Sequence, residues 1–161
     1  MTDTDSLTAL CAPWHGPYGG TPPFNAVRVS DFNTAIDTAM QESLQEIEAI
    51  AQQADAPTFE NTLAALERSG RMLDRVLAIY HIYTSCLNDE AMQAVEREVE
   101  PKLAAFHDSI TQNSALFQRI STVYEQRTHL GLSTEQQRLT WVQYQSFARD
   151  GAKLNDIDKQ K

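Results

Sequence analysis

Four histidines, two cysteines and 22 acidic residues are the side chains with which this chain of 161 residues could do acid–base, nucleophilic or metal chemistry. A di-iron site in a helical bundle needs a glutamate three residues before a histidine, so that both lie on one helix face. The residues at that position are alanine or glutamine before His15, His81, His107 and His129. The zinc-peptidase motif His-Glu-x-x-His, a Cys-x-x-Cys pair and a glycine-rich phosphate loop are absent as well. We therefore assign no catalytic, cofactor-binding or metal-binding residue in this chain.

Three further groups of polar residues favour a structural interpretation. His81 stands between two core positions, where a single histidine is more often a hydrogen-bonded structural residue than a catalyst. His107 and Asp108 are adjacent, and neighbouring helical residues diverge by about 100°, so they form no dyad on one face. A solvent-exposed acidic face is the expected role of the cluster Glu96, Glu98 and Glu100.

Composition excludes several classes of protein. A net charge of −9 argues against nucleic acid as a partner, because affinity for phosphates comes mainly from lysine and arginine. No apolar run is long enough to span a membrane, and the acidic start MTDTDSLTAL lacks the features of a signal peptide, so we expect a cytoplasmic protein. Cys11 and Cys86 imply no disulfide framework, and Cys86 is expected to be a buried, reduced thiol.

Residues 57–88 are the stretch around which the fold is expected to be organised. Thr58 is a candidate N-cap, and Glu60 in the first turn suits the positive end of a helix dipole. Apolar residues then follow heptad spacing for about four heptads, and a second apolar stripe joins after Gly70. This pattern predicts a central helix that packs on two sides. Gly70 is expected to mark a close approach between helices; the alternative, that it ends one helix, stays open.

Four more helices are expected, over residues 31–52, 89–112, 114–129 and 134–150. Pro101 lies within the second of these and predicts a kink or a boundary there. Connections are short and no strand pattern is present, so the sequence predicts an all-α, antiparallel bundle of about five helices. A sixth helix is expected to begin at Asn155, where too few residues remain to hold it, which indicates a fragment of a longer protein.

The N-terminal region is expected to differ from the bundle. Residues 1–13 are polar and aperiodic and are predicted to be a disordered tail, which leaves residues 14–161 as the helical domain. Residues 14–24 are rich in glycine and proline yet contain Trp14, Tyr18 and Phe24. We interpret them as an extended segment packed across the helices and pinned by its rings, with a flexible linker as the alternative.

Several motifs, taken in order, resemble a known enzyme family. They are WHGPYGGTPPF (residues 14–24), EIEAI (46–50), PTFENT (57–62), LERSG (66–70), ND (88–89), EPKLA (100–104) and GAKL (151–154). The ordered set is similar to the N-terminal helical region of the thimet-oligopeptidase-like zinc metallopeptidases, in particular the bacterial peptidyl-dipeptidases and oligopeptidase A. The resemblance covers about residues 13–161.

The resemblance implies only part of the function that the family name describes. In that family the zinc ligands and the catalytic glutamate lie in the C-terminal half, and none of those residues is present here. The matched region forms one wall of a deep substrate channel that restricts entry to short peptides. The resemblance thus implies a non-catalytic scaffold and substrate-restricting domain of a zinc-dependent parent, with the parent's catalytic region as its partner. The alternative is a stand-alone helical interaction module without enzymatic activity. An apolar stripe left uncovered in the isolated chain is expected to make it dimerise.

Overall fold

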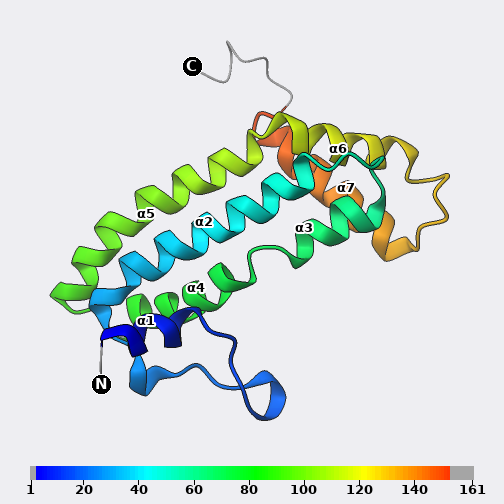
Figure 1. The fold of residues 1–161 in the computed structure, drawn as a ribbon. Coiled ribbons are helices and arrows are strands. Elements are labelled where there is room, and N and C mark those ends of the chain that lie inside the picture. Colours follow the sequence, from blue (N-terminus) through cyan, green and yellow to red (C-terminus); the bar gives the residue numbers. More distant parts are fainter. Residues whose placement is uncertain (1–2, 153–161) are drawn as a thin grey trace. The chain divides into compact units, whose positions relative to one another are not determined.

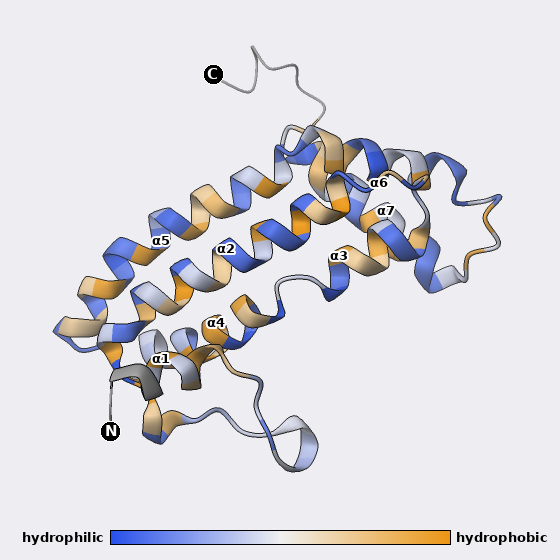
Figure 2. Ribbon diagram, viewed as in Figure 1, coloured by the Kyte–Doolittle hydropathy of each residue, from blue (hydrophilic) through white to orange (hydrophobic). Residues whose placement is uncertain are grey.

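The computed structural model describes residues 3–152, and all regular structure in that range is helical (Figure 1). The five longest helices are α2 (Phe32–Ala51), α4 (Arg71–Cys86), α5 (Glu90–Thr111), α6 (Ser114–Gln126) and α7 (Thr134–Arg149). Shorter elements are α1 (Asp3–Cys11), α3 (Ala64–Arg68), the π-helical turn η4 (Phe59–Leu63), and the 3-10 turns η1 (Pro17–Gly19), η2 (Phe24–Ala26) and η3 (Val29–Asp31). Each long helix carries both apolar and polar residues, as expected where one face is buried and the other is exposed (Figure 2). The predicted all-α fold is confirmed.

Helix ends follow the capping residues in the sequence. The Asn113 side chain accepts a hydrogen bond from the Leu116 N–H at 2.9 Å and begins α6. Ser133 and Gln136 form a reciprocal capping box at the start of α7. After α7 the chain turns at Gly151, whose φ is +91°. The predicted positions of α2, α6 and α7 are correct to within a few residues.

The predicted single helix over residues 57–88 is wrong. The Ser69 hydroxyl and backbone N–H both donate to the Leu66 carbonyl, which ends α3. Gly70 then adopts a left-handed conformation with φ +73°, and α4 begins at the next residue. Left-handed backbone breaks a right-handed helix, whereas the apolar heptad continues because both pieces need buried residues. The alternative, that Gly70 ends a helix, therefore holds.

Helix α5 continues through Pro101 with no boundary, so that part of the prediction is wrong. A proline removes one N–H donor from the helix and leaves one carbonyl of the preceding turn without its usual partner. Pro101 is exposed, so water can take the place of that donor.

Contacts divide the chain into two compact units. The first contains the described residues up to Ser43 together with Gly70–Ala104. In its core the Phe32 ring packs in T-shaped arrangements with Tyr80 and Tyr83, with ring centroids 5.8 and 5.2 Å apart. Fully buried around them are Leu10, Ile36, Val76, Ile79, Met92 and Val99.

The second unit contains Leu44–Ser69 and the described residues from Ala105 onward. Its core is built around Leu63 of η4 and Leu116, Ile120 and Val123 of α6, all of them fully buried. Helices α6 and α7 also share a series of stacked rings. The Tyr144 ring lies 3.9 Å from that of Tyr124 and 5.7 Å from that of Phe117, between centroids.

Residues 3–11 form α1, so the predicted disordered tail is wrong for this stretch. Ser6 and Leu10 are buried. The Arg28 backbone N–H donates to the Ser6 hydroxyl at 3.1 Å, and the Arg75 guanidinium donates to the Cys11 carbonyl at 3.0 Å. These contacts come from residues distant in sequence, which explains why local periodicity did not reveal the helix.

Other sequence expectations also need correction. Of the three rings expected to pin residues 14–24, only Trp14 is partly buried, while Tyr18 and Phe24 are exposed. Cys86 is exposed rather than buried. His81 is exposed because it follows the buried Tyr80 and points about 100° away from it. Leu44 of α2 and Val142 of α7, both apolar, are also exposed. The predicted sixth helix at Asn155 lies outside the described residues.

Candidate functional site

Within residues 3–152, the histidines considered as candidate reactive residues are not brought together. His15, His81, His107 and His129 are all exposed. Within residues 3–152 no three or more histidine, cysteine, aspartate or glutamate side chains are grouped as a metal site requires. His107 Nε2 lies 4.0 Å from the Asp150 carboxylate, an exposed pair that is ionic only when the histidine is protonated. The sequence assignment of no catalytic or metal-binding residue stays a prediction.

The acidic cluster on α5 is largely exposed, as expected, and its members also form hydrogen bonds. Glu100 accepts a hydrogen bond from the buried Tyr80 hydroxyl at 3.0 Å. Glu98 accepts from the Asn33 side-chain amide at 2.8 Å. One turn further along, Lys102 donates to both carboxylate oxygens of Asp37 at 2.9 and 2.8 Å. These bonds tie α5 to α2 and α4 within the first unit.

A half-buried thiol in the first unit is not activated for chemistry. Cys11 lines an apolar hollow of about 560 Å³ that also contacts Met72, Glu42 and Arg75. Burial, followed by the nearby Glu42 charge, raises the pKa of the Cys11 thiol. A raised pKa keeps the thiol protonated near neutral pH, and the protonated form is a poor nucleophile.

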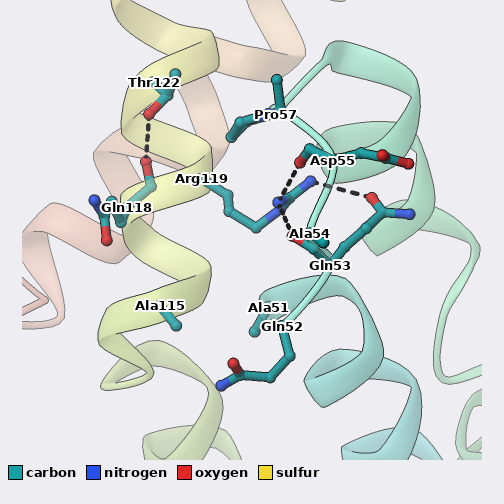
Figure 3. Close-up of a pocket in the computed structure, with 11 residues that line it drawn as sticks. Ala51, Gln52, Gln53, Ala54, Asp55, Pro57, Ala115, Gln118, Arg119 and Thr122 are labelled. Carbon is teal, nitrogen blue, oxygen red and sulfur yellow. Dashed lines mark hydrogen bonds between the residues drawn. The ribbon is translucent and has the colours of Figure 1, made fainter.

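The most elaborate polar arrangement in the described chain surrounds Arg119 on α6. This residue lies on the same helix face as Leu116, Ile120 and Val123, which the hydrophobic core holds in place. The core therefore fixes its side chain, and its exposed fraction is only 6%. Figure 3 shows the guanidinium reaching from α6 to the loop that carries Gln53 and Asp55. A charged group buried this deeply requires hydrogen-bond partners.

Arg119 finds its partners in the turn that follows α2. One terminal nitrogen donates to the Gln53 and Asp55 carbonyls, at 2.9 and 3.0 Å. The other donates to the side-chain oxygens of Gln53 and Asn61, at 3.1 and 3.0 Å. All four terminal N–H groups are thus engaged, and the fifth donor, Nε, is buried with no hydrogen-bond partner within the described residues.

Asn61 connects this arginine to the start of η4. Its side-chain oxygen also accepts from the Thr58 backbone N–H, while its amide donates to the Ala56 carbonyl. The Thr58 hydroxyl accepts in return from the Asn61 backbone N–H at 3.1 Å, which completes a capping box. Arg119, Asn61 and Thr58 therefore form one network that fixes the connection from α2 into η4. We call these three residues the clasp.

A hollow of about 440 Å³ lies beside the clasp, lined by residues 51–57 and by α6 residues that include Gln118 and Thr122 (Figure 3). Its lining holds one carboxylate, Asp55, and no histidine, cysteine or lysine. The terminal N–H groups of Arg119 are already bonded to protein oxygens, so an anion would have to displace them. The arrangement can hold a loop in one conformation, and it has no pair of groups for acid–base or nucleophilic chemistry.

The clasp was not predicted from the sequence, although one signal for Arg119 was present. An arginine at a position where Leu116, Ile120 and Val123 define a buried face is a charge that must be bonded internally. Its partners are two backbone carbonyls and two amides, and no residue type marks a backbone carbonyl in a sequence. The burial of Arg119 was therefore detectable from the sequence, whereas its hydrogen-bond acceptors were not.

The described helices include none that is long and apolar enough to cross a membrane. No protein-family model matches the chain. Among the curated proteins that match is a dipeptidyl carboxypeptidase of Salmonella typhimurium, 38% identical over 138 residues. A dipeptidyl carboxypeptidase of Escherichia coli is 36% identical over 140 residues. These matches cover 86% and 87% of the chain. The chain is a relative of the dipeptidyl carboxypeptidases.

This relationship confirms the resemblance carried by the sequence motifs. The chain spans about one-fifth of the length of the curated dipeptidyl carboxypeptidases it matches, 20% and 21%. The similarity therefore concerns one region of these peptidases and does not by itself show their activity for this chain.

Proposed function

We propose that this chain is a non-catalytic helical region of a cytoplasmic, zinc-dependent peptidyl-dipeptidase that hydrolyses short peptides. Within that enzyme it acts as a scaffold and as a wall that restricts access to the substrate channel. The observation that carries the proposal is the 36–38% identity to dipeptidyl carboxypeptidases over about 86% of the chain.

The residues of the chain support a non-catalytic role. Its sequence contains no His-Glu-x-x-His motif, and Arg119, the most buried charged side chain of the described residues, uses its four terminal N–H groups to hold a loop. These residues do not fit a zinc site, so zinc would be bound by a part of the peptidase outside this chain. Rigid helices joined by the clasp suit a channel wall, because a wall must keep its form while substrates pass.

A chimaeric enzyme tests this proposal. The chain would replace the matching region of the Escherichia coli dipeptidyl carboxypeptidase, and dipeptide release would be measured with peptides of increasing length. We expect the chimaera to bind zinc and to cleave short peptides, with kcat/KM falling as the peptide lengthens. The 161-residue chain alone is expected to show neither zinc binding nor cleavage.

Two results would contradict the proposal. A folded chimaera without peptidase activity would argue that this chain does not support the catalytic region. A chimaera that cleaves long and short peptides equally would remove the access-restricting role and leave the scaffold role. The first result would favour the alternative, a helical interaction module that is independent of peptidase activity.

A further inference from the structure

We propose that the loop over residues 14–24 presents Tyr18 as a docking knob for another part of the same longer polypeptide. The inference rests on the proposed function, because it requires a peptidase that extends beyond this chain. In the first unit the loop leaves the helices between α1 and α2 (Figure 1).

Tyr18 is the most exposed large hydrophobic residue in the described chain. Its relative exposed area is 106%, so the ring has essentially no contact with the rest of the structure. Phe24, at the other end of the loop, is also exposed at 43%. An exposed tyrosine offers a large, rigid, amphipathic surface with few rotatable bonds, and such residues are enriched at interfaces.

The backbone holds Tyr18 in place rather than leaving it on a flexible linker. Tyr18 has φ +58°, the only positive φ of a non-glycine residue in the described range. The Gly20 N–H donates to the Pro17 carbonyl at 3.1 Å and closes the turn. A Cβ on Gly20 would lie 2.5 Å from the His15 backbone nitrogen, so the base of the loop packs backbone on backbone. A strained residue held at the tip of a closed turn indicates a selected conformation.

The chemistry of the loop defines the surface that it fits. Residues 12–24 contain no aspartate, glutamate, lysine or arginine, although the whole chain has a net charge of −9. Charge therefore does not select the partner. The complementary surface is an apolar recess that contains a hydrogen-bond acceptor for the tyrosine hydroxyl. The surface of a folded protein can provide both features.

The small size of the knob indicates a partner within the same polypeptide. A stable complex between separate proteins buries about 800 Å² on each side, whereas a tyrosine contributes roughly 150–250 Å². A contact this small is sufficient only where the two surfaces are already linked by one chain, which removes the entropy cost of association. The matched dipeptidyl carboxypeptidases are about five times as long as the region they share with this chain, so such a linked surface is available.

Nitration of tyrosine by tetranitromethane, followed by peptide mass spectrometry, tests the inference. We expect Tyr18 to be nitrated rapidly in the 161-residue chain and about tenfold more slowly in the chimaera with the Escherichia coli enzyme. Tyr80 is fully buried and serves as an internal reference that reacts slowly in both proteins. The Tyr18→Ala substitution should lower the thermal midpoint of the chimaera and leave that of the isolated chain unchanged. Leu87→Ala, at another exposed position, is the control and should change neither.

Each other result decides against the inference. Equal nitration of Tyr18 in both proteins, in a chimaera that cleaves peptides, would reject the knob and retain the proposed function. Protection of Tyr18 in the isolated chain as strong as in the chimaera would identify a second copy, in place of a tethered surface, as the occupant. A chimaera that does not fold would contradict the proposed function, and the inference would fall with it.

Discussion

Arg119 shows how a buried charge is kept without a carboxylate partner. Its four terminal N–H groups bond to two carbonyls and two side-chain amides, all from residues 53–61. Neutral acceptors spread around a guanidinium replace its hydration, and their fixed positions in turn define the loop. The cation therefore stabilises a particular backbone path, which a salt bridge to one carboxylate would not do.

Replacement of this arginine should destabilise the second unit. Arg119→Met keeps most of the side-chain volume and removes all the donors, and we expect the free energy of unfolding to fall by about 2–4 kcal/mol. Urea denaturation followed by circular dichroism measures the change. Arg97→Met on the exposed surface of α5 is the matched control, with an expected change within about 0.5 kcal/mol. Equal stability of the two variants would show that the clasp does not contribute.

Gly70 has both a left-handed backbone and a close neighbouring atom, whereas Gly131 has only the left-handed backbone. Both Gly70 and Gly131 have left-handed backbone, with φ +73° and +65°. A Cβ at Gly70 would lie 3.3 Å from the Ser43 hydroxyl oxygen, whereas a Cβ at Gly131 would meet nothing within 4 Å. We expect Gly131→Ala to cost about 1 kcal/mol for the backbone alone, and Gly70→Ala to cost more. Thermal unfolding of each variant gives the comparison.

A double variant identifies the cause of any difference. Ser43→Ala removes the hydroxyl, so Gly70→Ala in that background should cost about as much as Gly131→Ala. If Gly70→Ala and Gly131→Ala cost the same in the natural background, the close approach of Gly70 to α2 contributes nothing to stability.

Residue identity in the sequence predicted some of these local features and not others. Asn113, Ser133 and Gly151 were identifiable because capping is a local interaction between a side chain and the next turn. The exposure of Tyr18 was not, because residue type does not distinguish a buried tyrosine from an exposed one, and burial depends on contacts made by the folded chain. Arg119 required knowledge of contacts across more than 50 residues.

A hydrogen bond from a tyrosine hydroxyl, a group that can ionise in alkali, joins helix α4 to helix α5 in the first unit. The Tyr80 hydroxyl, fully buried, donates to Glu100. Burial, followed by this hydrogen bond to a carboxylate, raises the pKa of Tyr80 far above its ordinary value. Burial raises the pKa of the neighbouring Tyr83 as well. Both shifts make the folded state retain a proton that the unfolded state loses in alkaline solution.

The stability of the chain should therefore decrease in alkali. A tyrosine in the unfolded chain ionises near about pH 10, so the contribution of Tyr80 is complete below that value and is lost as the pH rises above it. Urea midpoints measured from about pH 8 to about pH 11.5 should fall at the upper end. Tyr80→Phe should cost about 1 kcal/mol at neutral pH and make that fall shallower. Tyr18→Phe is the control, and identical slopes for both variants would contradict the role of Tyr80.

At the level of elements, periodicity predicted the helical content but not the break at Gly70. The apolar spacing from Phe59 to Leu87 is what one long helix would show. However, Phe59 and Leu63 of η4 are buried in the second unit and Leu73 and Tyr80 of α4 in the first, while Leu87 is exposed. A hydrophobic pattern specifies which residues are buried and carries no information on which core receives them. Only Gly70 and the preceding Ser69 mark the boundary. Both residue types are common in turns but also occur inside helices, so they do not by themselves specify a break.

For the molecule as a whole, one expectation from the sequence concerns the behaviour of the isolated chain. Tyr18 and Phe24 leave apolar surface in solvent, and exposed patches of this kind favour self-association. The loop is too small for a tight dimer, and a net charge of −9 adds repulsion between copies. We therefore expect weak, reversible association that strengthens with salt, because salt screens the repulsion and leaves apolar contacts intact.

Sedimentation velocity over a range of concentrations, at low and high ionic strength, tests this expectation. The sedimentation coefficient should rise with protein concentration, and more steeply at high salt. Replacement of both Tyr18 and Phe24 by serine should abolish the rise, while Leu87→Ser and Val142→Ser, at exposed positions elsewhere, should leave it intact. Association that weakens with salt would instead point to contacts between charged residues. A single monomeric species at every concentration would show that the exposed loop needs a tethered partner, which is the arrangement that a longer peptidase chain would provide.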